Sequence, residues 1–111
     1  MIGPRPDAVA AQVWIATQPV DMRKSFDGLA EVVRTFLGHD PLSGNLFVFR
    51  NRSCQRVKIL WWDQRGLAIY YKRLERGVFR FPTASDKAIA VDSVQLLRLL
   101  DGSEIITRRA G

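Results

Sequence analysis

Apolar residues alternate with basic or polar residues in three runs between positions 45 and 74. A period of two is typical of β-strands that have two distinct faces. The runs cover residues 45–50, 55–62 and 67–74, and four turn-forming residues separate each run from the next. This spacing predicts a three-stranded antiparallel meander, because short turns join neighbouring antiparallel strands.

The N-terminal part adds a strand and a helix to this meander. Residues 13–17 predict a short strand, and a turn follows it. Apolar residues then recur at helical spacing over residues 23–37, and Gly38 marks the end of the helix. This amphipathic helix is the longest element that we expect.

The C-terminal part predicts shorter elements. Residues 77–82 are expected to be extended, and residues 83–90 form a linker. Asp92 or Ser93 caps a short helix that Gly102 ends, and residues 103–107 are a candidate last strand. The predicted fold class is α+β: an antiparallel β-meander of three to five strands, one long helix on its apolar face and a short C-terminal helix.

The alternation also sorts the side chains of the meander onto two faces. Short hairpin turns would place residue 48 opposite residue 57 and residue 58 opposite residue 71. We expect the long helix to cover the apolar face, which consists of Leu46, Val48, Val57, Ile59, Trp61, Ala68 and Tyr70. We expect the other face to be open at one end, with Phe47, Phe49, Arg56, Lys58, Tyr71 and Arg73, and covered by the C-terminal helix at the other, with Leu60, Trp62, Leu67 and Ile69.

The same segment carries the positive charge of the chain. Residues 50–80 hold nine basic residues and two acidic ones, a local charge of +7 in a chain of formal net charge +6. Clustered cations favour a polyanion such as nucleic acid, because each phosphate contact releases counterions, and exposed rings can stack on bases. The candidate nucleic-acid-binding residues are Arg50, Arg52, Arg56, Lys58, Arg65, Tyr71, Lys72 and Arg73.

Catalytic chemistry finds little support in the sequence. His39 and Cys54 are the only histidine and the only cysteine, so neither a disulfide within the chain nor a Cys/His metal site can form. The aspartates lie in turns or near helix ends, where capping explains them. We therefore expect no catalytic residue, no metal and no cofactor, and a protein that is not an enzyme. Without a signal peptide or a membrane span, the expected compartment is the cytoplasm.

Four spaced blocks of residues between positions 21 and 75 are distinctive. They are Asp21-Met22-Arg23-Lys24 with Phe26-Asp27-Gly28-Leu29, Phe49 with Asn51-Arg52, Lys58-Ile59-Leu60 with Trp62-Asp63, and Tyr71-Lys72-Arg73-Leu74-Glu75. In this order they resemble the TnpB family of accessory proteins of bacterial insertion sequences, which shares only its name with an RNA-guided nuclease. The similarity runs over about residues 10–83.

The resemblance implies a bacterial protein needed for transposition, encoded between the small protein TnpA and a separate transposase, TnpC. DNA of low sequence specificity, the transposase and the small accessory protein are the partners that it implies. No catalytic residue is carried over. We expect one domain over residues 1–111, with a flexible leader over 1–11, a TnpB-like core over 12–83, and a linker, short helix and basic tail over 84–111.

Three other functions stay open at the level of sequence. An RNA-binding module would use the same rings and cations on a sheet surface. A protein–protein adaptor would direct the basic patch towards an acidic surface of the transposase and make no nucleic-acid contact. An undetected nuclease would show metal-dependent cleavage of DNA.

Overall fold

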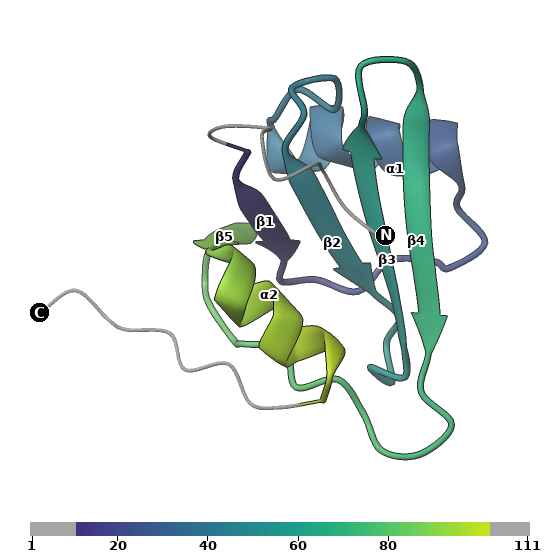
Figure 1. Cartoon of the computed structure of the whole chain (residues 1–111), viewed down its shortest axis with the longest axis vertical. Helices are drawn as coiled ribbons and strands as arrows, with labels where there is room; N and C mark the ends of the chain where they lie inside the picture. The colour runs from purple at the N-terminus through teal and green to yellow at the C-terminus, as the bar shows by residue number, and fades with distance from the viewer. Residues whose placement is uncertain (1–10, 103–111) are drawn as a thin grey trace, which may run out of the picture.

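The computed structural model describes residues 11–102, which form a five-stranded sheet with helical segments on both faces (Figure 1). In chain order the elements are β1 (Val13–Ala16), α1 (Phe26–Glu31), η1 (Val32–Leu37), β2 (Leu46–Arg50), β3 (Arg56–Trp62), β4 (Leu67–Arg73), β5 (Ala88–Val91) and α2 (Ser93–Leu100). The α+β class is confirmed. Residues 1–10 of the leader expected over residues 1–11 lie outside the described residues. The strand expected over 103–107 and the basic tail lie outside them as well.

The sheet is mixed, so the prediction of a purely antiparallel meander is wrong. Its strand order is β4-β3-β2-β1-β5, in which β1 runs parallel to β2 and every other pair is antiparallel. The reason is the connection: α1 and η1 lie between β1 and β2, and a crossover of this length returns the chain in the same direction. The expected linker over residues 83–90 contains most of β5, which pairs with β1.

The first helix is shorter than the sequence predicts. It starts at Phe26 and has 12 residues, six α-helical and six π-helical. The preceding residues form a turn, in which the Lys24 amide donates to the Asp21 carbonyl at 3.0 Å. The predicted end is confirmed, because Gly38 has a φ of +73°, the left-handed conformation that ends many helices.

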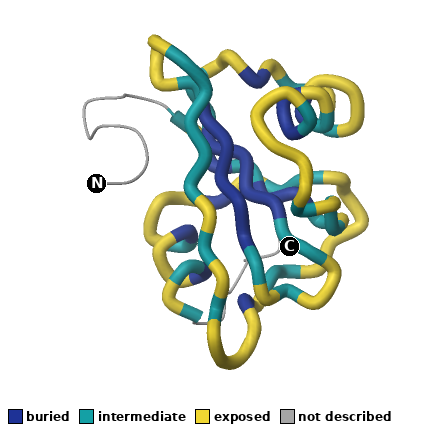
Figure 2. Tube along the Cα trace, turned by 90° about the vertical axis from the view of Figure 1, so that its right-hand side faces the viewer, coloured by how far each residue is buried: buried dark blue, intermediate teal, exposed yellow. Residues whose placement is uncertain are grey.

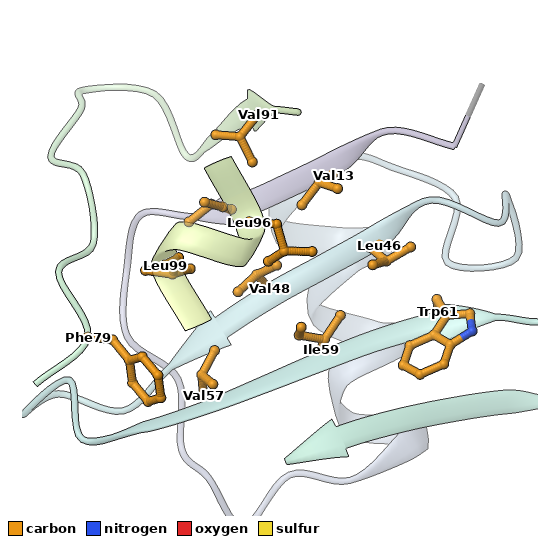
Figure 3. Packing of buried hydrophobic residues seen from close by; sticks show 11 residues of the cluster. Val13, Leu46, Val48, Val57, Ile59, Trp61, Phe79, Val91, Leu96 and Leu99 are labelled. Carbon is orange, nitrogen blue, oxygen red and sulfur yellow. The ribbon is translucent and has the colours of Figure 1, made fainter. Parts of the chain in front are cut away.

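The two faces contain the predicted side chains, but the helices cover the opposite faces. Phe47, Phe49 and Leu60 pack against Leu29 and Val33 of the first helix. On the other side, α2 directs its buried leucines onto β1, β2 and β3 (Figure 3). The α2-side cluster consists of Val13, Ile15, Leu46, Val48, Val57, Ile59, Trp61, Phe79, Val91, Leu96 and Leu99.

The hairpin registers explain why the predicted assignment of side chains to the two faces is correct. Lys58 lies opposite Tyr71, as predicted, whereas Val48 lies opposite Ile59 instead of Val57. A shift of two residues leaves every side chain on its face. Strands β2 and β3 are therefore buried along nearly their whole length, and they lie deep between exposed loops (Figure 2).

This packing predicts the effect of shortening Phe49. Its ring is fully buried, so Phe49→Ala should lower the free energy of unfolding by about 3–5 kcal/mol, measured by urea denaturation. Phe26 is 45% exposed, and Phe26→Ala is the matched control, with an expected loss of about 1 kcal/mol or less. Equal effects of the two substitutions would contradict the packing described above.

Candidate nucleic-acid interface

Lys58 is the one charged residue in the buried core of the described chain. Its side chain extends from β3 towards the turn before α1, and the residue is 7% exposed. The ammonium donates to the carbonyls of Met22 at 2.7 Å and Lys24 at 2.8 Å, and it lies 4.6 Å from the centre of the Tyr71 ring. Lys58 thus fastens the turn to the sheet and has no open side for a phosphate.

Two more candidate cations also hold backbone in place. The Arg50 guanidinium donates to the Thr17 carbonyl at 3.1 Å and lies 5.7 Å from the centre of the Phe81 ring. The Lys72 ammonium donates to the Leu100 carbonyl at 2.9 Å, where a cation meets the negative end of the α2 dipole. Both groups bridge segments that are distant in sequence.

Arg56 and Arg73 form a pair of like charges across two strands. They lie directly opposite each other on β3 and β4 and on the same face. Arg56 Nη1 donates to the Tyr71 hydroxyl at 3.2 Å, and Arg73 Nε donates to the Glu75 carboxylate at 3.0 Å. These four side chains line an open hollow. Like charges in direct opposition destabilise a sheet, so this site favours an anion.

Three loops meet beside this pair at one end of the sheet. The Val20 amide donates to Arg50, the Leu74 amide to Gln55 and the Phe79 amide to Cys54, each to the backbone carbonyl. The loops therefore carry further cations to the same region. We call this region the basic end, and it consists of Lys24, Arg52, Arg56, Arg73, Arg76 and Arg80.

Arg65 lies elsewhere. It occupies the turn between β3 and β4, beyond the Trp62–Leu67 pair, whereas Arg56 pairs with Arg73 at the other end of the same hairpin. Six residues of strand separate the two ends, which corresponds to roughly 20 Å. The structure thus brings together Arg52, Arg56, Tyr71 and Arg73 of the candidate set and separates Arg65 from them.

The rings expected at the interface are distributed differently from the prediction. Phe47 and Phe49 were expected in the open, and this is wrong because α1 and η1 cover their face. Tyr71 is 47% exposed and lies beside the arginine pair, whereas Trp62, a further candidate ring, is half-buried at the other end of β3. The candidate set omitted Arg76 and Arg80, which are exposed in the loop after β4. The charge count of residues 50–80 included both arginines and could have identified them as candidates.

Asp21 and Arg23 form an ion pair at the border of this end. Arg23 donates through both its backbone amide and its guanidinium to the Asp21 carboxylate. These hydrogen bonds lower the pKa of Asp21 from 3.8 to about 2. Arg23 is therefore part of the turn before α1. The neighbouring hollow is lined by Pro19, Val20, Asp21, Met22, Asn51, Arg52 and Ser53.

The family described as IS66 Orf2 like protein (TnpB_IS66) matches residues 11–110, nearly all of the chain. The chain belongs to this family. The resemblance stated from the sequence blocks is confirmed, and membership gives the chain an accessory role in bacterial insertion sequences.

Two relatives of this family member come from Sinorhizobium fredii (strain NBRC 101917 / NGR234), and both are described as uncharacterized proteins. The protein y4hO is 46% identical over 97 residues, which cover 87% of this chain and 84% of the relative. The protein y4jC is 37% identical over 102 residues, which cover 92% and 85%. No solved structure matches the chain.

Residues 11–102 of this family member contain neither a metal-binding cluster nor a membrane-spanning helix. No group of three or more His, Cys, Asp or Glu side chains there is arranged to hold a metal ion. No helix in this range is both long enough and apolar enough to cross a membrane.

Replacing Lys58 tests its structural role. Lys58→Met keeps the length of the side chain but leaves the Met22 and Lys24 carbonyls without their donor. The free energy of unfolding should fall by about 1–3 kcal/mol, measured by urea denaturation. Arg52→Met removes an exposed cation from the same end and should change it by about 0.5 kcal/mol or less. An unchanged stability of Lys58→Met would exclude the fastening role.

The lowered pKa of Asp21 predicts a dependence of stability on pH. The carboxylate binds its proton less readily in the folded chain, so its contribution is complete above the unfolded value of 3.8 and is lost as the pH falls towards about 2. Asp21→Asn should therefore lower the midpoint of thermal unfolding at pH 6, and the difference from the unsubstituted chain should shrink between pH 4 and pH 2. A difference independent of pH would contradict the ion pair.

Proposed function

We propose that this chain is a non-enzymatic accessory factor of transposition that binds DNA phosphates through its basic end and assists a separate transposase. The observation that carries the proposal is the direct opposition of Arg56 and Arg73. One intramolecular carboxylate, that of Glu75, reaches Arg73, and Arg56 has a neutral phenol as its partner. A phosphate placed in the hollow would contact both guanidinium groups.

The surrounding cations extend the contact beyond one phosphate. Lys24, Arg52, Arg76 and Arg80 are exposed, and no side-chain partner holds them within the described part of the chain. They project from three loops, so they can follow the backbone of a nucleic acid at several points. Contacts of this kind position a protein on DNA without reading its sequence.

The shape of the basic end favours duplex DNA over an unstacked strand. Proteins that bind single strands use several aromatic rings as stacking platforms. Here Phe47 and Phe49 are buried, and Tyr71 is the exposed ring beside the arginine pair. Its hydroxyl and its ring already contact Arg56 and Lys58. Phosphate contact therefore outweighs base stacking at this site.

Docking onto the transposase is the second candidate function, and an apolar feature of α2 favours it. Val94 and Leu97 are 58% and 64% exposed and lie one helical turn apart. Apolar side chains exposed next to each other are typical of protein contact. The two functions are compatible, because α2 and the arginine pair lie on opposite faces of the sheet.

A titration of DNA binding tests the main proposal. Duplexes from the element end and of unrelated sequence should bind with similar affinity, measured by fluorescence anisotropy at several salt concentrations. Six phosphate contacts predict a slope of about −5 for the logarithm of the association constant against the logarithm of salt concentration. Arg56→Glu combined with Arg73→Glu should weaken binding about 10- to 100-fold and reduce the slope by about 2.

Arg34→Glu combined with Arg98→Glu is the matched control, because it changes the net charge equally at exposed sites on the two helical segments. It should retain most of the affinity. Absence of binding at low salt would refute the proposal. Equal losses of affinity in the two double variants would show that net charge alone governs binding. In the same reactions, magnesium should leave the DNA intact, since the proposal includes no enzyme activity.

A further inference from the structure

Strand β4 is the outer strand of the sheet, and no other strand within residues 11–102 pairs with its outer side. Its seven residues pair one to one with β3 on one side, and in Figure 2 no described segment lies in front of its other side. It contains no proline and no bulge, two devices with which proteins commonly protect an edge, and its two cations, Lys72 and Arg73, lie at its C-terminal end. The opposite edge, β5, has four residues. The long edge of the sheet is thus ready for another strand.

The hydrogen bonds at both ends of the hairpin show which groups point outwards. The Asp63 amide donates to the Gly66 carbonyl, and the Leu74 amide donates to the Gln55 carbonyl. Gly66 and Leu74 flank β4, so the even-numbered residues of β4 direct their amides and carbonyls towards β3. In an antiparallel ladder this direction alternates. The amides and carbonyls of Leu67, Ile69, Tyr71 and Arg73 therefore point to the open edge.

We propose that a second copy of this chain pairs with this edge, antiparallel and centred on Tyr70. In this register Leu67 lies opposite the partner's Arg73, and Ile69 lies opposite the partner's Tyr71. All seven residues of both strands are paired, and all outward groups find partners. The register also places Lys72 and Arg73 opposite apolar residues, so no cation of one strand faces a cation of the other.

The apolar side chains of β4 fit this arrangement. Leu67, Ala68, Ile69 and Tyr70 are all half-buried, whereas Ile59, Leu60 and Trp61, which face Tyr70, Ile69 and Ala68 across the ladder, are buried. A neighbouring strand covers the outer side of such residues on both faces of the sheet. Pairing the edge thus completes two cores that end at β4 in the single chain.

Charge complementarity at the two ends of the strand favours a copy of the same chain as the partner. At each end of the paired strands, the turn that holds Arg65 lies beside the loop after the partner's β4, which holds the partner's Glu75. Within one chain these residues belong to opposite ends of the hairpin, roughly 20 Å apart. Arg65 is exposed and has no side-chain hydrogen bond within residues 11–102. The two-fold axis produces this ion pair twice.

The pairing would also complete the basic end. Glu75 is the acid that engages Arg73 in the single chain. In the pair, the partner's Arg65 competes for this carboxylate, so Arg73 becomes available and one more cation joins the surface. This last step rests on the proposed DNA binding, whereas the pairing itself does not. Two basic ends then lie on the same face of a ten-stranded sheet.

The size of this contact limits its strength. Standard protein interfaces bury about 1,200–2,000 Å² in total, and one pair of seven-residue strands buries less. We therefore expect a dissociation constant in the micromolar range. Sedimentation velocity of the full chain without DNA, from about 1 μM to about 1 mM, should show a reversible monomer–dimer equilibrium.

Substitutions at the edge test the register. Ile69→Pro removes one outward amide and none that faces β3, so it should abolish the dimer, with the fold checked by circular dichroism. Arg65→Glu and Glu75→Arg should each weaken the dimer about tenfold, because each places like charges together at two symmetric positions. The double substitution restores opposite charges and should restore the dimer.

Arg98→Glu changes the net charge as Arg65→Glu does, but on α2, and should leave the dimer unchanged. A chain that stays monomeric over the whole concentration range would overturn the proposal. A dimer that the double substitution fails to restore would overturn it as well, because another surface would then form the contact. Since DNA is absent, either result leaves the test of DNA binding independent.

Discussion

The structure depends on the burial of β2 and β3 on both faces of the sheet. Residues 57–61 are all buried, so these strands have no solvated side on which a cation can lie. Basic residues are consequently confined to strand ends, loops and the outer strand. Lys58 is the exception, and the fold compensates its charge with two carbonyls and the Tyr71 ring, since a buried ammonium without such partners would be costly. Two-sided burial thus decides where the positive charge of this chain can appear.

That constraint divides the basic residues into two groups with different tasks. Arg50, Lys58 and Lys72 donate to carbonyls of segments distant in sequence and hold the turn before α1, the end of β1 and the end of α2. The basic end consists of cations on the loops and strand ends that meet beside them. The second group depends on the first, because the loops that carry it are held by the inward-facing cations and by backbone bonds between loops. A cluster of charge in the sequence therefore overstates the number of cations available to a ligand.

The sequence predicted the two sets of side chains but not what covers them. Alternation depends on parity alone, so the assignment of Val48 and Phe49 to opposite faces tolerated a register error of two residues. Which helix packs on which face depends on the direction in which the chain crosses over between β1 and β2, and no local pattern records that. Because the long helix was assigned to the opposite face, the face of Phe49 was expected to be open. Strand β5 was missed because four apolar residues in a linker carry too little periodicity to indicate a strand.

Tyr71 joins the inward and the outward cations. Its ring lies against the Lys58 ammonium, and its hydroxyl accepts a hydrogen bond from Arg56. An anion that draws Arg56 away from this hydroxyl would leave Lys58 in place, because the Met22 and Lys24 carbonyls retain the ammonium. In the proposed phosphate binding, surface side chains such as Arg56 would move, and we expect the backbone beneath them to stay fixed. A surface organised in this way would lose little conformational freedom on binding, so we expect charge and salt to determine the affinity of the proposed interaction.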